Sequence, residues 1–243
     1  MGVHLERARV LIDLGRAVQA EEELRQELAE QSENFEAHRL LAWCLASQGY
    51  LPQARAEAEE AIRLQPDRDT VHQTFGWILI KQGHWKEAEK AVREAIRLNP
   101  QYAGHFFMLA HLFERRKRWK DCEEAAREGL RLDPEHLNCA NILAHALLEL
   151  NRPNESQRVL ESAMAKDPEN AWVHINKGLL SHKQDKKRES LHHFREAARI
   201  DPENKDVHGF IEQLQQNPIT WSFMFAFIIY LVIRLILLLL AIT

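Results

Sequence analysis

One phrase recurs along this chain at a fixed interval, and that interval constrains the fold more than any other feature of the sequence. The phrase AIRLNP at 95–100 has close relatives in AIRLQP, GLRLDP, AMAKDP and AARIDP. Each step is 34 residues, and the recurring prolines are Pro66, Pro100, Pro134, Pro168 and Pro202. A fixed period of this length predicts a repeat protein in which every unit is one supersecondary element.

Within each unit the apolar pattern is helical. If the proline is position 32, units begin at residues 35, 69, 103, 137 and 171, and residues 1–34 form a first unit with Ser32 in its place. Apolar or small residues then fall at positions 7, 8 and 11 and again at 20, 24 and 27. Spacings of three and four residues place side chains on one helical face, so each of the six units is predicted to contain two short amphipathic helices.

Turn residues mark the helix ends. Gly15, Gly49 and Gly83 stand where the first helix should stop, because glycine adopts the left-handed conformation without a steric penalty. The proline at position 32 should close the second helix, since it lacks an N–H and biases the preceding residue away from helix. Residues 203–217 are predicted to form a capping helix and linker that ends at Asn217 and Pro218.

The small residues at positions 8, 20 and 27 resemble the pattern of the tetratricopeptide repeat family over residues 1–202. The resemblance implies an all-α fold, a right-handed α-solenoid of six helix-turn-helix repeats with a concave face. A single hairpin cannot bury its own apolar stripe, so neighbouring repeats do so by stacking. The sixth unit departs from the pattern with Lys177 at position 7 and Ser181 at position 11, and we expect it to be the most loosely packed.

The residues that follow Pro218 are predominantly apolar. From Phe223 to Ala241 the only charge is Arg234, and Trp221 stands at the N-terminal edge, where an indole favours the membrane interface. The stretch is long enough to span a hydrocarbon core of roughly 30 Å. Its fourteen Leu, Ile, Phe or Val residues, at about −0.3 to −0.6 kcal/mol each, outweigh an arginine at about 2.5 to 3.5 kcal/mol. We therefore predict a C-terminal transmembrane helix over 219–242 that anchors the chain in a lipid bilayer, with a buried core helix as the alternative.

Composition and motifs narrow the function. The charged N-terminus does not read as a signal peptide, and three cysteines without paired spacing suit a reducing compartment, so we expect a single-pass membrane protein with cytoplasmic repeats. A net charge of −4 disfavours nucleic acid as a partner. The sequence holds no phosphate-binding loop, nucleophile elbow or zinc motif, so we expect no enzyme activity, cofactor, metal or small-molecule substrate.

Histidines recur in register. His4, His38, His72, His174 and His208 all occupy position 4 of their units, which the family commonly fills with an aromatic ring. We interpret them as packing residues, with metal binding or pH sensing as the alternative. The neighbours His192 and His193 are interpreted as a solvated pair, and Cys44 and Cys122 as small core residues.

The resemblance also implies where a partner would bind. In this family the concave groove is lined by first-helix positions 2, 5, 9, 12 and 13. Repeats that recognise acidic chaperone tails carry Lys at position 5 and Asn at position 9, and this chain departs at both, so such a carboxylate clamp is not expected. The candidate groove residues are Arg39, Trp43, Gln73, Trp77, Phe107, His111, Asn141, His145 and Trp172.

Trp43 and Trp77 are the leading candidates, because two indoles 34 residues apart should project from neighbouring first helices into one trough. Packing within the superhelix is the alternative role for this pair. The sequence therefore predicts a membrane-anchored scaffold that binds a protein segment in its groove. The rival hypothesis is an assembly or regulatory subunit of a membrane enzyme, in which Arg234 pairs inside the membrane.

Overall fold

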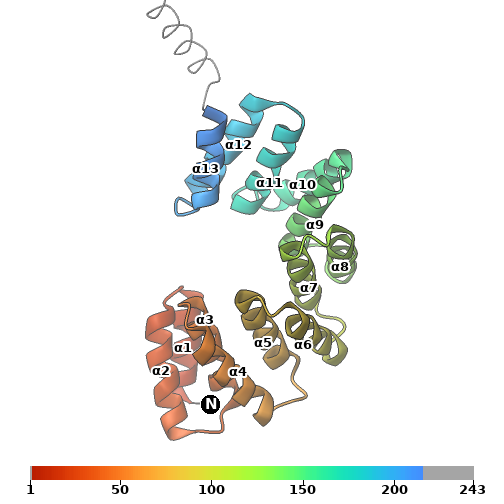
Figure 1. The fold of residues 1–243 in the computed structure, drawn as a ribbon. Coiled ribbons are helices and arrows are strands. Elements are labelled where there is room, and N and C mark those ends of the chain that lie inside the picture. The colour runs from red at the N-terminus through yellow and green to blue at the C-terminus, as the bar shows by residue number, and fades with distance from the viewer. Residues whose placement is uncertain (1, 216–243) are drawn as a thin grey trace, which may run out of the picture. The chain divides into compact units, whose positions relative to one another are not determined.

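The computed structural model describes residues 2–215, and this part of the chain contains thirteen helices and no strand (Figure 1). The chain also divides into two compact units, each of which is larger than one 34-residue repeat. We call Met1–Val159 unit 1 and Leu160–Thr243 unit 2, and we describe them separately. The boundary falls inside one helix, α10.

Every repeat contains the two predicted helices. The first helices are α1 (Val3–Asp13), α3 (Phe35–Ser47), α5 (Asp69–Gln82), α7 (Ala103–Arg115), α9 (Leu137–Glu149) and α11 (Ala171–Lys183). The second helices are α2 (Ala17–Glu30), α4 (Leu51–Leu64), α6 (Trp85–Leu98), α8 (Trp119–Leu132), α10 (Pro153–Lys166) and α12 (Lys187–Ile200). All second helices cover the same repeat positions, 17 to 30. The last helix is α13 (Lys205–Gln215), which lies within the predicted capping segment.

The backbone before the recurring proline is extended, as the steric clash with the proline ring requires. Gln65, with a φ of −142°, and Asp201, with a φ of −126°, both follow the last residue of a second helix. Gln31 has a φ of −135° although Ser32 follows it in place of proline. The conformation therefore belongs to the repeat itself, and the proline reinforces it.

The turn between the two helices of a repeat is left-handed at position 15. Gly15, Gly49 and Gly83 have φ values of 72°, 90° and 77°, which confirms their predicted role. The three later repeats keep this backbone without glycine, which the glycine pattern did not predict. Their residues at position 15, with φ values of 55°, 59° and 59°, are Lys117, Asn151 and Asp185.

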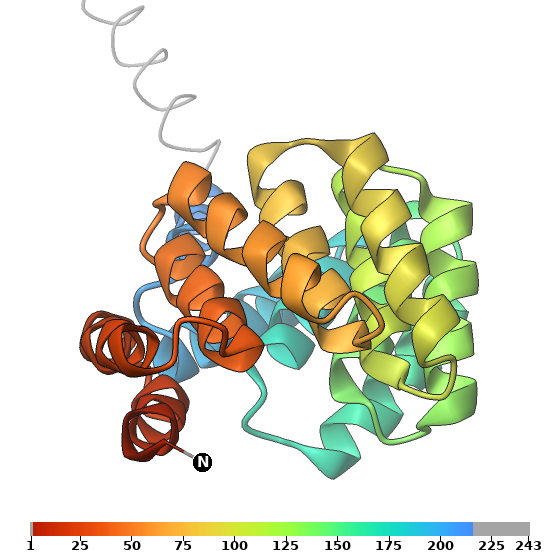
Figure 2. The ribbon, with the colours of Figure 1, turned by 90° about the horizontal axis from the view of Figure 1, so that it is seen from below.

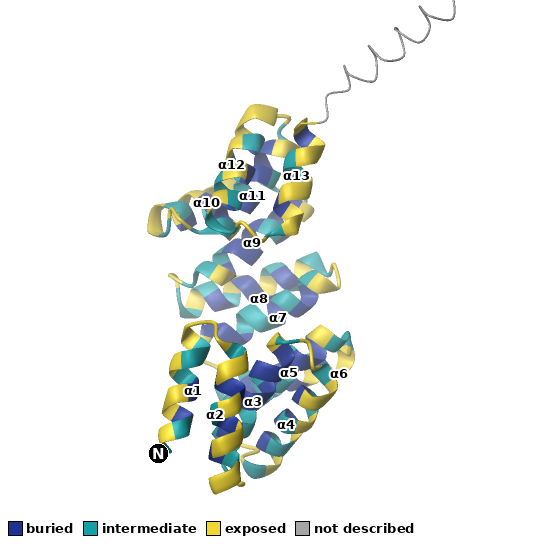
Figure 3. Ribbon diagram, turned by 90° about the vertical axis from the view of Figure 1, so that its left-hand side faces the viewer, coloured by how far each residue is buried: buried dark blue, intermediate teal, exposed yellow. Residues whose placement is uncertain are grey.

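In unit 1, each second helix packs against its own first helix and the first helix of the next repeat (Figures 1 and 2). The first helices also contact one another, α3 with α5, α5 with α7 and α7 with α9. The first helices carry many of the buried residues, which are dark blue in Figure 3. Small residues permit close approach of the two helices within a repeat. A Cβ atom added to Gly76 at position 8 would lie 2.7 Å from Val92 Cγ2.

In unit 2, α12 packs between α11 and α13. Phe194 on α12 is 1% exposed and lies over Gly178, where an added Cβ would come within 2.8 Å of its ring. The Phe194 ring stacks on Phe210 of α13 with centroids 4.9 Å apart. Ser190 Oγ donates a hydrogen bond of 2.9 Å to the Gly178 carbonyl, and Ser181 is also buried, so these two serines of the sixth repeat lie inside the packed interior, whereas Lys177 is only half-buried.

None of the helices described between residues 2 and 215 combines the length and apolar character needed to cross a bilayer. The segment 219–242 that we predicted to do so, with Trp221 and Arg234, lies outside the described residues. Its role therefore stays a prediction.

Candidate functional site

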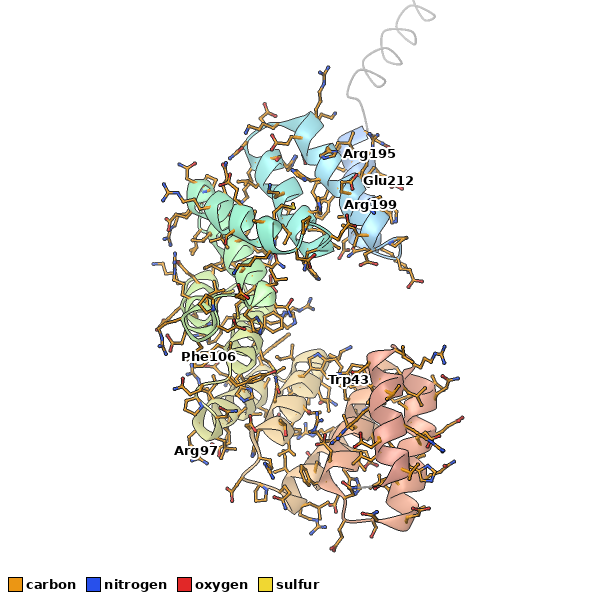
Figure 4. All side chains as sticks on the ribbon, turned by 180° about the vertical axis from the view of Figure 1, so that it is seen from behind. Trp43, Arg97, Phe106, Arg195, Arg199 and Glu212 are labelled. Atoms are coloured by element: carbon orange, nitrogen blue, oxygen red, sulfur yellow. The ribbon has the colours of Figure 1, made fainter. Side chains whose placement is uncertain are left out.

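The candidate site lies on the first helices of unit 1. We call the side chains at positions 2, 5, 9, 12 and 13 of these helices the first-helix face. Trp43 on α3 and Trp77 on α5 meet there, with ring centroids 6.1 Å apart and ring planes inclined by 15° (Trp43 is labelled in Figure 4). Both side chains are half-buried. The structure thus brings together the two tryptophans that the 34-residue spacing placed on neighbouring repeats.

These indoles have contacts on two sides. Both pack against the hydrophobic core formed by α1 to α5, so the packing role that we held as the alternative accounts for part of their surface. On the solvent side, Lys81 Nζ lies 4.7 Å from the centroid of the Trp77 ring, within the range of a cation–π interaction. The pair is anchored in the core and still presents aromatic surface to solvent.

A second group of side chains continues the face on α7 and α9. The rings of Phe107 and His111 stack with centroids 6.2 Å apart. His111 Nδ1 lies 3.2 Å and His145 Nδ1 lies 2.7 Å from the carboxylate of Glu114. Burial raises the pKa of Glu114, but the hydrogen bonds from the two histidines outweigh burial and bring that pKa to about 2.

Glu114 was not among the residues predicted from the sequence, although it occupies position 12 of its repeat. The available signal was an acidic residue at a groove position between two histidines at position 9 of successive repeats. His145 also meets the ring of Trp119 edge to face, with centroids 5.5 Å apart. The imidazole is therefore held from two sides.

Arg39 is fully engaged within the protein. Its guanidinium donates to both carboxylate oxygens of Glu36, at 2.9 and 2.7 Å, and Arg9 donates to the same carboxylate at 3.3 Å. Burial raises the pKa of Glu36, but the two arginines hold it below its usual value. Gln73 is half-buried, whereas Asn141 is only 5% exposed and offers almost no surface to a partner.

The face is hollowed at one end. An open cavity of about 470 Å³ lies between the N-terminal parts of α1, α3 and α5, and its lining includes Leu5, Arg9, Glu36 and Thr70. These residues occupy positions 5, 9, 2 and 2 of the first three repeats. The remaining candidate, Trp172, belongs to α11 in unit 2, where it is 60% exposed.

The position-4 histidines make a repeated hydrogen bond that gives the packing interpretation a physical basis. In the four cases where another repeat segment precedes the histidine, Nε2 donates to the carbonyl at position 32 of that preceding repeat, whereas His4 in the first repeat pairs with Glu23 instead. The pairs are His38 with Ser32 at 3.0 Å, His72 with Pro66 at 2.7 Å, His174 with Pro168 at 3.0 Å and His208 with Pro202 at 2.9 Å. These bonds tie each first helix to the turn before it.

The interpretation of His192 and His193 as a solvated pair is wrong for His193. His192 is exposed, but His193 is half-buried and its Nδ1 lies 3.3 Å from Nδ1 of His174. The physical reason is the repeat register, because position 23 of a second helix faces position 4 of the first.

The cysteines lack the properties of a reactive site. Cys44, Cys122 and Cys139 are all buried free thiols, and burial raises the pKa of each to about 12. A thiol rather than a thiolate is a poor nucleophile. No set of three or more His, Cys, Asp or Glu side chains converges as a metal site within residues 2–215.

Comparison with known families agrees with this architecture. A family model described as "T7SS, ESX-1 secretion system protein EccA1, N-terminal domain" matches residues 55–210, more than half of the 243-residue chain. A tetratricopeptide repeat model matches residues 5–69. No curated protein matches the sequence.

Solved structures share the fold at low identity. A chain of the APC/C hetero-tetramer Cut9–Hcn1 superposes with a TM-score of 0.75 at 14% identity, over 88% of this chain but only 42% of that one. PilF of Pseudomonas aeruginosa gives 0.68 at 18% identity, over 86% and 96% of the two chains. YrrB, described as a TPR protein with an unusual peptide-binding site, gives 0.53 at 17% identity, over 78% and 97%.

Proposed function

Because the chain belongs to the family of the EccA1 N-terminal domain and is built of tetratricopeptide repeats, we propose that it is an interaction scaffold that binds a protein segment on the first-helix face of unit 1. The observation that carries this proposal is the stacked pair of Trp43 and Trp77. The pair is fixed by the core on one side and offers aromatic surface on the other.

Aromatic side chains held in this way suit a binding site. A tryptophan that is already anchored loses little conformational entropy when a partner covers it, and large aromatic residues often dominate interface energies. Truncation of such a residue costs about 2 kcal/mol or more at a hot spot. That free energy corresponds to roughly a thirtyfold loss of affinity.

We further propose that residues 219–242 anchor the scaffold in a membrane with the repeats on the cytoplasmic side. The support is the apolar composition of this stretch, in which Arg234 is the only charged residue. The family description names a secretion-system protein, and a membrane-attached scaffold would suit an assembly of that kind. An Arg234 that pairs inside the membrane would instead favour a subunit of a membrane enzyme.

The groove is tested by Trp43→Ala combined with Trp77→Ala in the full-length chain. We expect partner capture from mild detergent to be lost while the helical circular dichroism spectrum is retained. The matched control is Tyr50→Ala combined with Tyr102→Ala, which removes two exposed aromatic rings, 51% and 49% exposed, outside the first-helix face. Unchanged capture by the tryptophan variant would refute the proposal, and loss of its helical spectrum would assign the pair to packing.

The anchor is tested by a chain that ends at Gln216. The repeats bury their apolar stripes without the C-terminal segment, so this shorter chain should stay in the supernatant when membranes are sedimented, whereas the full chain should sediment with them. Sedimentation of the shorter chain with membranes would contradict the anchor.

A further inference from the structure

Position 4 and position 23 face each other within a repeat, and the residues there change along the chain. In the first two repeats a histidine faces a carboxylate. His4 Nδ1 lies 2.6 Å from Glu23 Oε2, and His38 Nδ1 lies 2.6 Å from Glu57 Oε2. In the sixth repeat position 23 is His193, so two imidazoles meet without a carboxylate between them.

The orientation of His174 is fixed by its surroundings. Its Nε2 donates to the Pro168 carbonyl at 3.0 Å, and the residue is 8% exposed. The neutral ring therefore carries its proton on Nε2 and directs the lone pair of Nδ1 toward His193. Histidines that bind metals almost always donate their other ring N–H to a carbonyl, a carboxylate or water in this way.

The separation of the two nitrogens fits a tetrahedral ion. Zinc–nitrogen bonds of about 2.0–2.1 Å at a tetrahedral angle place two ligand nitrogens about 3.3–3.4 Å apart. A square-planar ion with similar bonds would need about 2.9 Å. The observed distance between His174 Nδ1 and His193 Nδ1 is 3.3 Å.

We propose that His174 and His193 form a two-ligand site for Zn²⁺ between α11 and α12, with water in the remaining coordination positions. This site is independent of the first-helix face and of the proposed scaffold function.

Electrostatics around the pair act in both directions. The charged groups that act on His193 are Lys177 and Glu189. Lys177 on α11 opposes a bound cation, while Glu189 on α12 favours the charged imidazole and would favour the cation. The affinity for Zn²⁺ should therefore rise when the charge of Lys177 is removed.

The test is calorimetric titration of ZnCl₂ into the full-length protein in detergent at pH 7.5. We expect the wild-type chain to bind one more Zn²⁺ than His193→Gln, or to bind it at least tenfold more tightly. The matched control is His72→Gln, which removes a position-4 histidine that makes the same carbonyl bond but faces Ala91 at position 23. This control should bind zinc as the wild type does.

Lys177→Gln provides a second measurement that keeps both histidines. Removal of the ammonium should tighten zinc binding, and Co²⁺ in place of Zn²⁺ should give the visible absorption of a tetrahedral site that is absent from His193→Gln. Equal zinc binding by wild type and His193→Gln would mean a hydrogen-bonded histidine pair only and would overturn the proposal. Weaker binding by Lys177→Gln would do the same.

Discussion

The left-handed backbone at position 15 permits a quantitative test of the repeat architecture. All six repeats adopt this conformation, yet only the first three have glycine there. Lys117→Gly relieves a lysine that holds a φ of 55°, and Gly49→Ala imposes a Cβ atom on a φ of 90°. The two substitutions should therefore change stability in opposite directions.

The expected change in the free energy of unfolding follows from two opposing contributions. A left-handed conformation costs an ordinary L-residue roughly 1–2 kcal/mol. Glycine loses about 0.5–1 kcal/mol more backbone entropy on folding than alanine does. Lys117→Gly should thus raise the free energy of unfolding by about 0.5–1 kcal/mol, and Gly49→Ala should lower it by a similar amount. No atom lies within 4 Å of a Cβ added at Gly49, so the loss there is conformational.

The assay is urea unfolding of the repeat domain followed by far-ultraviolet circular dichroism, with midpoints compared because solenoids often unfold in several steps. In thermal unfolding, 1 kcal/mol corresponds to about 2–4 °C for a chain of this size. The control is Arg116→Gly one residue earlier, where φ is −96° and glycine should only destabilise. A lower midpoint for Lys117→Gly, or an unchanged midpoint for Gly49→Ala, would refute the reasoning.

Two further predictions concern ionisable groups. The folded-state pKa of Glu114, about 2, lies below the ordinary 4.5, so its contribution to stability is complete above pH 4.5 and is lost as the pH falls toward 2. Glu114→Gln should lower the free energy of unfolding at pH 7 by up to about 3 kcal/mol, a difference that should vanish across that window in acid unfolding curves. The buried thiols should resist alkylation at pH 8 until the protein unfolds, and rapid modification of the native protein would contradict their burial. These thiols are Cys44, Cys122 and Cys139.

The helical architecture was predictable because a fixed period leaves few alternatives. Two apolar stripes per 34 residues predict two helices, and the second helices indeed occupy the same positions in all six repeats. The turn at position 15 was predicted only where glycine marks it, although Asn151 and Asp185 are also residue types that favour a positive φ. Lysine carries no intrinsic signal for a positive φ, so Lys117 could be assigned only by analogy with Gly83 one repeat earlier.

The repeat positions of the candidate site residues could be predicted from the sequence, but the contacts between their side chains could not. The spacing of Trp43 and Trp77 placed them on neighbouring helices, and the structure brings their rings together. The bond between Glu114 and His145 depends on rotamers and on contact across repeats, which periodicity alone does not specify. His193 adjoins an exposed histidine in sequence, but its repeat position places it opposite His174, which its neighbour His192 does not reveal.

The charged groups of the first-helix face bear on how the proposed scaffold would select a partner. Arg39 is held by Glu36, and Glu114 is held by two histidines, so these charges already have partners within the protein. A partner that paired with them would have to replace existing hydrogen bonds, which reduces the net gain in free energy. Within residues 2–215, the polar group that lies on the aromatic surface of this pair is Lys81, whose cation–π contact with Trp77 is exposed and weak. On the proposed function, apolar contact with these two rings therefore supplies most of the binding free energy, and the paired charges serve mainly to hold the face in shape.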